Sequence, residues 1–277
     1  MGATEDAARG RPAQPRGTDF ISSDPPAKEA PPDKFGNSAR DYELGRPVWP
    51  GELVDRAAAD LGLGPDSTVL DLGAGTGKLT RDLVTRFGRV VAVEPDGAML
   101  GVLEEVVPAA EAVAGRAEAI PLPNDSVDAV FTAEAFHWYA SDETVAEIVR
   151  VLRPRGGLVI FFNVDFGDPE PSMGEEVDLV LNVAFAKGGS PGIGKVLSGY
   201  WREPIAKAGF EPLTEAESER WLTRTRDQWV ANMLSVSSIA SLPDTDRVEL
   251  AATLRGLVPD AEYRWTIRTA AYWTRLA

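Results

Sequence analysis

The sequence predicts a doubly wound α/β fold, in which helices cover both faces of a mostly parallel, seven-stranded sheet, with helical insertions toward the C-terminus. Short apolar runs alternate with helical patterns along the first half of the chain, as in a sheet built from crossover units. The run at residues 158–163 is almost continuously apolar, which is typical of a strand buried on both faces. A glycine-rich turn at residues 73–77 joins the first strand to a helix, and such a turn lets a ligand approach the backbone closely.

The individual elements follow from hydrophobic periodicity and from turn residues. Strands are expected at residues 69–72, 89–94, 111–114, 127–132, 158–163, 211–222 and 262–276. Helices are expected at residues 52–61, 78–87, 141–152, 172–187, 200–208, 225–234 and 243–257. Ser141 is the expected N-cap of one helix, and Thr225 with Gln228 forms a capping box for another. The prolines within residues 39–50 argue against a helix there.

Composition limits the classes of function. The chain has 277 residues, with 28 Lys and Arg against 43 Asp and Glu, and a net charge of −15 argues against a nucleic-acid partner. It has no cysteine and one histidine, which excludes cysteine-based zinc sites and histidine clusters, so we expect no metal. Residues 1–33 are rich in proline and charge and predict a disordered tail, which leaves residues 34–277 as the folded domain. Since no signal peptide or membrane-spanning run appears, we expect a cytoplasmic protein without a membrane partner, and nothing indicates an oligomeric state.

The glycine turn has the form Asp71-x-Gly73-x-Gly75-x-Gly77. A dinucleotide-binding turn needs its third glycine where this chain has Lys78. A phosphate-binding Walker loop would need glycine at position 72 and serine or threonine at 79, and leucine occupies both positions. The remaining form carries an acid two residues before the first glycine, and this acid favours a cationic ligand over a phosphate.

On these residues, positions 68–163 resemble the S-adenosylmethionine-binding core of the class I methyltransferases, and the chain is similar to the methyltransferase type 11 and trans-aconitate methyltransferase branch. The resemblance implies S-adenosylmethionine as cofactor and S-adenosylhomocysteine as product. It also implies a core at residues 35–163 and helical substrate-lid insertions at residues 164–210 and 223–258. The positions that it assigns to the cofactor are Tyr42, Arg46, Asp71, Gly73, Ala74, Gly75, Gly77, Glu94, Pro95, Met99, Ala117, Glu118 and Glu134.

Glu94 has the strongest case on its own chemistry. It ends the second predicted strand, 17 residues after Gly77, and a carboxylate at that place can accept hydrogen bonds from both hydroxyls of a ribose. Glu118 is a candidate for the adenine edge, and a plain loop acid is an equal alternative. In this family, Tyr42 and Arg46 would cover the cofactor, although a segment that only packs on the core is an equal alternative for them.

His137 is the candidate catalytic residue. It follows the fourth predicted strand, which lies beside the first strand at the ligand-binding edge of this topology, and it would orient or deprotonate the methyl acceptor. A purely structural histidine is the alternative. The expected substrate-binding residues are His137, Trp138, Tyr42, Trp201 and Trp229, although aromatic residues at helical spacing are more often core.

The expected function is methyl transfer from S-adenosylmethionine to a small molecule, with an oxygen acceptor slightly favoured and nitrogen, carbon or a carboxylate left open. Such a reaction needs mainly that the nucleophile and the methyl carbon be held in contact and aligned. Two alternatives differ in class. One is an S-adenosylmethionine-binding protein that catalyses a non-methylating reaction such as a cyclisation, and the other is an NAD-dependent oxidoreductase, which Lys78 disfavours.

Overall fold

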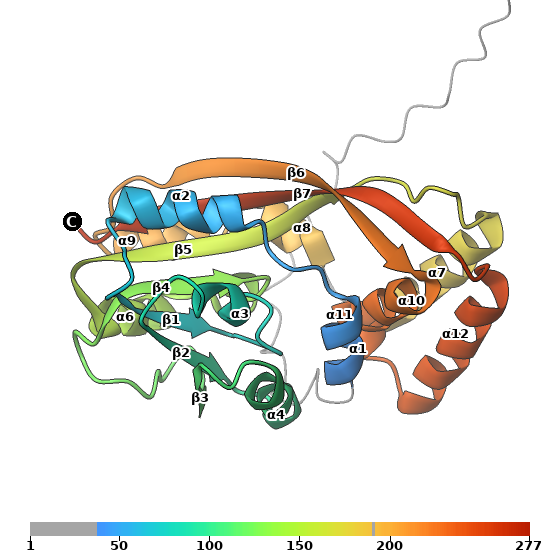
Figure 1. Ribbon diagram of the computed structural model, residues 1–277, viewed down its shortest axis with the longest axis horizontal. Helices are drawn as coiled ribbons and strands as arrows, with labels where there is room; N and C mark the ends of the chain where they lie inside the picture. The colour runs from blue at the N-terminus through green and yellow to red at the C-terminus, as the bar shows by residue number, and fades with distance from the viewer. Residues whose placement is uncertain (1–37, 190–191) are drawn as a thin grey trace, which may run out of the picture.

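The computed structural model describes residues 38–189 and 192–277 (Figure 1). The predicted disordered tail at residues 1–33 lies outside the described residues. In the described part of the chain, seven strands form one sheet in the order β3-β2-β1-β4-β5-β7-β6. The strands are β1 (Thr68–Leu72), β2 (Arg89–Glu94), β3 (Glu111–Ala114), β4 (Val127–Ala133), β5 (Leu152–Phe166), β6 (Thr214–Thr225) and β7 (Glu262–Arg275).

The sheet confirms the predicted fold class. Strands β1 to β5 pair in parallel, and β7 runs antiparallel to both β5 and β6. The chain leaves β1 toward β2 and β3 on one side, and then returns to place β4 on the other side. Open α/β sheets bind ligands at the carboxyl ends of the strands where the strand order reverses, so the site is expected between β1 and β4.

Helices cover both faces of the parallel strands. They are α1 (Ala39–Gly45), α2 (Gly51–Leu61), α3 (Thr80–Leu83), α4 (Gly97–Val106), α5 (Phe136–Tyr139), α6 (Asp142–Val151), α7 (Glu175–Gly188), α8 (Gly192–Leu197), α9 (Arg202–Lys207), α10 (Arg226–Leu234), α11 (Ser237–Ala240) and α12 (Asp244–Leu257). Helices α2 and α3 share one buried cluster with Val69 and Phe131 of the sheet. Helices α5, α6 and α9 share another with Leu70 and Val130, on the opposite face, because neighbouring residues of a strand point to opposite sides.

A helical lobe extends the sheet beyond its parallel strands. Strands β5, β6 and β7 contain 15, 12 and 14 residues, against 4 to 7 for the others, and Figure 1 shows them running from the sheet to the helices α7, α10 and α12. The far ends of β6 and β7 join these helices in a third buried cluster that contains Val230, Leu254 and Trp265. The lobe therefore stands beside the carboxyl ends of the parallel strands, carried on the same sheet.

Three local predictions were wrong. Residues 39–45 form helix α1, because Pro47 and Pro50 lie after its end; Pro47 restricts Arg46, which is extended at the C-cap, and leaves the helix itself unrestricted. Strand β5 begins at Leu152 and includes Gly156 and Gly157, which were expected to belong to a break between helix and strand. The helix predicted at residues 78–87 is much shorter, since α3 covers Thr80–Leu83.

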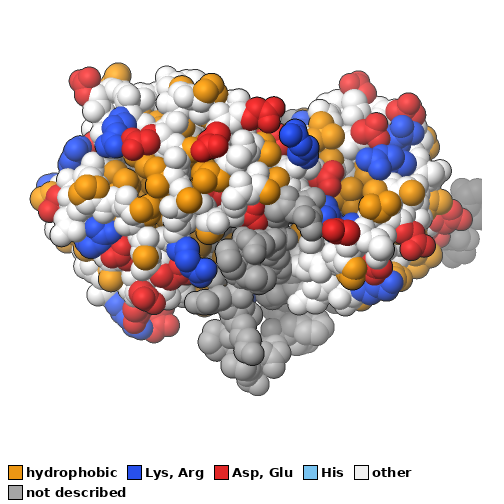
Figure 2. Space-filling model, turned by 90° about the horizontal axis from the view of Figure 1, so that it is seen from below, with side chains coloured by type: hydrophobic (Ala, Val, Ile, Leu, Met, Phe, Trp, Pro, Cys, Tyr) orange, Lys and Arg blue, Asp and Glu red, His pale blue; other side chains and the backbone are white. Residues whose placement is uncertain are grey.

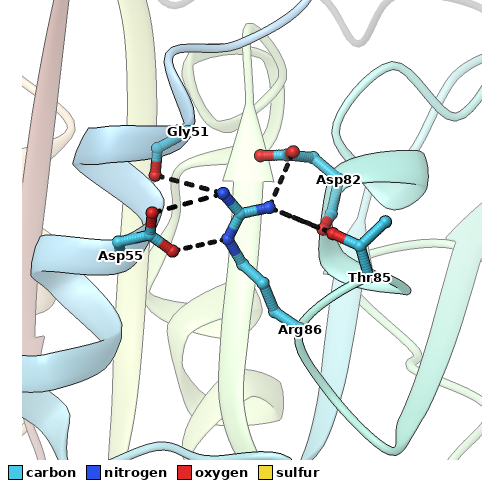
Figure 3. Close-up of polar contacts among 5 residues, drawn as sticks. All are labelled: Gly51, Asp55, Asp82, Thr85 and Arg86. Atoms are coloured by element: carbon cyan, nitrogen blue, oxygen red, sulfur yellow. Dashed lines mark hydrogen bonds and ion pairs between the residues drawn. The ribbon is translucent and has the colours of Figure 1, made fainter.

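Arg86 ties helix α2 to the end of α3 (Figure 3). Its Nε donates to Asp55 Oδ1 at 2.6 Å, and its Nη1 donates to Asp82 Oδ1 at 2.7 Å. Its Nη2 also reaches the Gly51 carbonyl at 3.5 Å. Because α2 follows directly after α1 and its flanking prolines, this contact fixes where the N-terminal segment enters the sheet domain.

The surface is charged with both signs. Figure 2 shows described Lys and Arg side chains interspersed with Asp and Glu over the face that it presents. In the described part of the chain, no helix combines the length and the apolar character that a membrane span requires.

Candidate active site

A cavity of about 750 Å³ opens at the carboxyl ends of β1 and β4, at the reversal of strand order. This volume lies in the usual range for a small-molecule site. One part of its wall comes from α1 and from the ends of β1 to β4, and the other part comes from β5, α7, α10, α11 and β7. One continuous cavity therefore joins the sheet edge to the helical lobe.

The three glycines of the turn have different structural roles. Gly73 and Gly75 line the cavity, at φ +72° and +58°. A Cβ on Gly75 would meet nothing nearer than the Tyr42 ring at 3.8 Å, so it would occupy the cavity itself. Gly77 does not line the cavity; a Cβ there would lie 2.9 Å from Val107 Cγ2, so this glycine lets the turn pack against the end of α4.

Glu94 is a buried carboxylate on the cavity wall, with 7% of its surface exposed. Its Oε2 accepts from the Gly75 backbone N–H at 2.8 Å, and its Oε1 accepts from the Asp96 N–H at 3.0 Å. Burial raises the pKa of Glu94 to about 7, against the effect of these two hydrogen bonds. Each oxygen has a further lone pair, so the carboxylate can also accept from a ligand that carries two hydroxyls.

Asp71 does not line the cavity. It lies inside β1 with 1% of its surface exposed, and its Oδ2 accepts from Thr80 Oγ1 at 2.6 Å. Burial raises its pKa to about 7. This hydrogen bond joins β1 to α3, and Asp71 lies outside the lining of the cavity in which its cofactor contact was predicted.

Glu134 follows β4 in the left-handed conformation, at φ +52°. A non-glycine residue in this region costs about 1 kcal/mol or more and persists where its surroundings hold it. Here the Asn163 N–H donates to Glu134 Oε1 at 2.6 Å. Burial raises the pKa of Glu134, and the Arg46 guanidinium opposes that shift. The strained backbone places this carboxylate on the cavity wall.

Helix α1 bridges the sheet domain and the lobe. Tyr42 lines the cavity, and burial, together with the carboxylates of Glu134, Glu94 and Asp71, raises its pKa to about 12. Arg46 donates from Nε to Ser235 Oγ at 2.9 Å and from Nη2 to the Ser235 carbonyl at 3.0 Å. The segment 42–46 therefore covers the cavity from the sheet edge to the lobe.

His137 lies in the short helix α5 that follows β4, and it lines the cavity. Its ring packs 4.8 Å from the Trp138 ring and 5.8 Å from Phe162, and its buried Nδ1 has no hydrogen-bond partner. Burial, with a smaller contribution from Lys195, lowers the pKa of His137 to about 4. The imidazole is therefore neutral near pH 7, which lets it accept a hydrogen bond from a ligand.

The lobe contributes an apolar and aromatic wall. The residues involved are Phe185 of α7, Trp229 and Met233 of α10, Val236, and Trp265 of β7. The polar residues of this wall are uncharged: Asn232, Ser235 and Ser237. Such a wall suits an uncharged organic ligand.

Comparison with known proteins agrees with this geometry. A methyltransferase-domain family model matches residues 70–160. An uncharacterized methyltransferase of Mycobacterium tuberculosis is 48% identical over 132 residues, which cover 47% of this chain and 51% of that protein. A methyltransferase-like protein of Schizosaccharomyces pombe is 33% identical over 221 residues, which cover 79% of this chain and 84% of that protein. The chain belongs to the class I methyltransferase family.

A solved structure supports the same assignment. A protein of Anaeromyxobacter dehalogenans, assigned as a type II methyltransferase, superposes with a TM-score of 0.58 and 25% identity, and covers 83% of this chain and 97% of that one. This chain spans about half the length of the first curated relatives that it matches. The NAD-dependent oxidoreductase receives no support from these relatives.

The cavity brings together most of the predicted residues. Those that line it are Tyr42, Arg46, Gly73, Gly75, Glu94, Pro95, Met99, Ala117, Glu118, Glu134, His137, Trp138 and Trp229. Ala74, like Asp71 and Gly77, lies outside its lining. Trp201, which was predicted to bind substrate, does not line the cavity either. Its side chain is 1% exposed and packs edge-on against Phe136, in the buried cluster that α6 and α9 share.

Sequence reasoning missed several residues of the site. Asn163 lines the cavity, and its side-chain Oδ1 accepts from the buried Thr269 hydroxyl at 2.8 Å. Asn232, Ser235 and Phe185 also line it, from the predicted lid insertions, in which only Trp201 and Trp229 were expected to bind substrate. One signal in the sequence could have identified Asn163. It ends the fifth predicted strand, and this strand lies beside β4, whose carboxyl end borders the cavity.

Proposed function

We propose that this methyltransferase transfers the methyl group of S-adenosylmethionine to a small, uncharged acceptor, with oxygen favoured as the methylated atom. The observation that carries the proposal is the continuity of one cavity from the carboxylates of Glu94 and Glu134 to the aromatic wall of the lobe. The acidic end suits a cationic ligand with hydroxyl groups, and the aromatic end suits an apolar acceptor.

The residues present fit the cofactor. Glu94 would accept from the ribose hydroxyls, Ala117 and Glu118 would meet the adenine edge, and Glu134 with Tyr42 would face the methionine end. The space above Gly75, which any side chain there would fill, supports a ligand lying against the backbone. When bound, S-adenosylmethionine supplies an electrophilic methyl group.

The acceptor would be held by the lobe and by α5. His137, neutral near pH 7, would accept a hydrogen bond from the acceptor hydroxyl and so orient its oxygen. A pKa of about 4 makes the imidazole a weak base, so orientation is its favoured role over net deprotonation. Trp138, Trp229 and Met233 would pack on the acceptor and exclude water.

A carboxylate acceptor is less favoured than an uncharged one. The polar residues from α10 and α11 on the cavity wall carry no charge. Of the two arginines that line the cavity, Arg46 already donates to both the hydroxyl and the carbonyl of Ser235, and Arg116 pairs with Glu118. A buried carboxylate would therefore lack a dedicated charged partner on the lobe side.

The test is an acceptor screen with methyl-deuterated S-adenosylmethionine, read by mass spectrometry of the acceptor and by release of S-adenosylhomocysteine. Methyl transfer gives a product that carries the label and an equal amount of S-adenosylhomocysteine. A rearranged product of unchanged mass without S-adenosylhomocysteine would instead favour the non-methylating reaction. A thermal melt comes first, because a ligand at about 100 times its Kd adds roughly 2.7 kcal/mol to the native state.

A further inference from the structure

A second cavity, of about 500 Å³, also borders α1, where Arg40, Glu43 and Leu44 line it. Its charged lining residues come from four separate elements: Arg40, Glu43 and Arg46 from α1 and its cap, Lys78 from the glycine turn, Glu105 from α4, and Arg224 from the end of β6. Gln228 of α10 completes the polar wall. Four cations thus face two carboxylates, in a chain whose net charge is −15.

Each carboxylate pairs with one of these cations, Glu43 with Lys78 and Glu105 with Arg40, and neither forms an ion pair with Arg46 or Arg224. Glu43 is already engaged, since its Oε2 accepts from Thr76 Oγ1 at 2.7 Å and its Oε1 accepts from Arg81 Nη2 at 2.7 Å. The Lys78 ammonium also lies 3.3 Å from Glu43 Oε1. Glu105 pairs with the exposed Arg40 at 3.8 Å, which is a long and solvated contact.

Arg224 has no carboxylate partner among the described residues. Its Nη1 donates to the Thr223 carbonyl at 3.0 Å, and none of the ion pairs among the described residues includes it. Burial lowers the pKa values of Arg224, Lys78 and Arg220, and the positive charge of Arg224 adds a smaller lowering at Lys78 and Arg220. Arg220, four positions earlier on β6, has a buried Nε without a hydrogen-bond partner. These like charges destabilise one another, and an anion would remove that cost.

The same cavity has an apolar part. Leu44, Val48 and Val106 line it and are 50%, 47% and 38% exposed. Large aliphatic side chains this exposed beside arginines suit a ligand that carries an anionic group and an uncharged group side by side.

We propose that this second cavity binds the phosphate group of a soluble phosphate ester, with Arg224, Lys78 and Gln228 as donors to the phosphate and the uncharged part of the ester on Leu44, Val48 and Val106. A dianion with three acceptor oxygens matches several converging cations better than a single carboxylate does. The proposal goes beyond methyl transfer, and S-adenosylmethionine has no phosphate to compete for the site.

The position of α1 couples this site to the cofactor cavity. Tyr42 lines the first cavity, Glu43 lines the second, and Arg46 lines both. A phosphate in the second cavity would add contacts to α1 in the position that covers the cofactor. We therefore expect phosphate-ester binding to tighten the binding of S-adenosylhomocysteine.

The experiment is isothermal titration of the full chain with n-butyl phosphate, without cofactor, against n-butanol and against sodium chloride at matched ionic strength. We expect saturable binding of the ester alone. Arg224→Gln should weaken it at least about tenfold, as expected for the loss of one charge-assisted contact. Gln228→Glu should abolish it by placing a carboxylate in the cavity, while a glutamate preserves the capping box with Thr225. Arg89→Gln, which removes an exposed arginine paired with Glu111, is the matched control and should bind like the wild type.

Several outcomes would overturn the proposal. One is the absence of saturable binding beyond the chloride control. Another is wild-type affinity in both Arg224→Gln and Gln228→Glu, with their folding checked by thermal melts. Binding of the chain to phosphatidate vesicles without binding of n-butyl phosphate would replace the soluble ester with a membrane headgroup.

Discussion

Glu94 is the residue on which cofactor binding should depend most. Its two oxygens already accept backbone N–H groups from Gly75 and Asp96, and they face the cavity. In Glu94→Gln the amide keeps one acceptor oxygen and turns an NH₂ group toward a donor or toward the ligand hydroxyls. We expect affinity for S-adenosylhomocysteine, measured by titration calorimetry, to fall by at least about tenfold, or roughly 1.4 kcal/mol.

Glu111→Gln is the control for that measurement, because Glu111 is an exposed carboxylate on the neighbouring strand β3. It should leave the affinity unchanged. If Glu94→Gln binds S-adenosylhomocysteine within about twofold of the wild type, the proposed ribose contact is wrong.

His137 should affect turnover more than cofactor binding. Its neutral ring lines the cavity beside Trp138, and the change His137→Ala removes the proposed hydrogen bond to the acceptor while leaving the acidic end of the cavity intact. For an acceptor found in the screen, we expect kcat to fall about tenfold to a thousandfold and the Kd for S-adenosylhomocysteine to stay nearly constant. Unchanged turnover would mean that the histidine is structural.

Residues of the site differ in how far the sequence predicts them. Gly73, Gly75 and Glu94 lie within one short stretch, so their spacing alone indicates a ligand site. Ser235 has no such local signal: it meets Arg46 across 189 positions, and only the fold brings them together. Asp71 shows the reverse case: it belongs to the informative local pattern, but its carboxylate accepts from the Thr80 hydroxyl and lies outside the cavity lining.

Among the elements, α1 couples the lobe to the cofactor cavity through close backbone packing. A Cβ on Gly45 would lie 2.1 Å from the backbone N of Asn232 in α10. Gly45→Ala must therefore displace α1, with an expected cost of about 1–3 kcal/mol of stability and weaker binding of S-adenosylhomocysteine, since Tyr42 and Arg46 move with the helix. Urea unfolding and titration calorimetry measure the two effects.

Gly101→Ala is the matched control in a helix. A Cβ on Gly101 in α4 would meet no atom within 4 Å, so alanine should stabilise the protein by about 0.5–1 kcal/mol through its higher helix propensity. Equal stability and equal cofactor affinity in Gly45→Ala and the wild type would show that α1 does not need its close contact with α10.

Elements defined by local chemistry were predicted well, and elements shaped by long-range pairing were not. The prediction of β2 at residues 89–94 is confirmed, as is the capping box at Thr225. Strand β5 runs through Gly156 and Gly157, because it pairs with β7 and because Leu61 of α2 packs where a Cβ of Gly157 would lie, 2.5 Å from Leu61 Cδ1. No pattern within residues 152–157 reveals that contact.

At the scale of the whole molecule, buried acids make the free energy of unfolding decrease as pH rises toward neutrality. The folded-state pKa values of Asp71 and Glu94 are raised to about 7, well above those of an unfolded chain. Between about pH 4 and pH 7 the native state thus binds more protons than the unfolded state, and stability falls as pH rises through this interval. His137 acts in the opposite direction, because its pKa is lowered to about 4 and stability is lost as pH falls below about 6.5.

Urea unfolding of the ligand-free protein at pH 5.5 and pH 7.5 isolates the contribution of Glu94 when the wild type is compared with Glu94→Gln. The variant cannot titrate at this position, so the loss of stability between the two pH values should be smaller in it by on the order of 1–2 kcal/mol. Comparing slopes instead of absolute stabilities removes the constant cost of the substitution. Glu111→Gln, at an exposed carboxylate away from the cavity, is the control for the substitution itself. Identical slopes in all three proteins would show that Glu94 is ionised in the ligand-free state, and the carboxylate would then meet a cationic ligand without first releasing a proton.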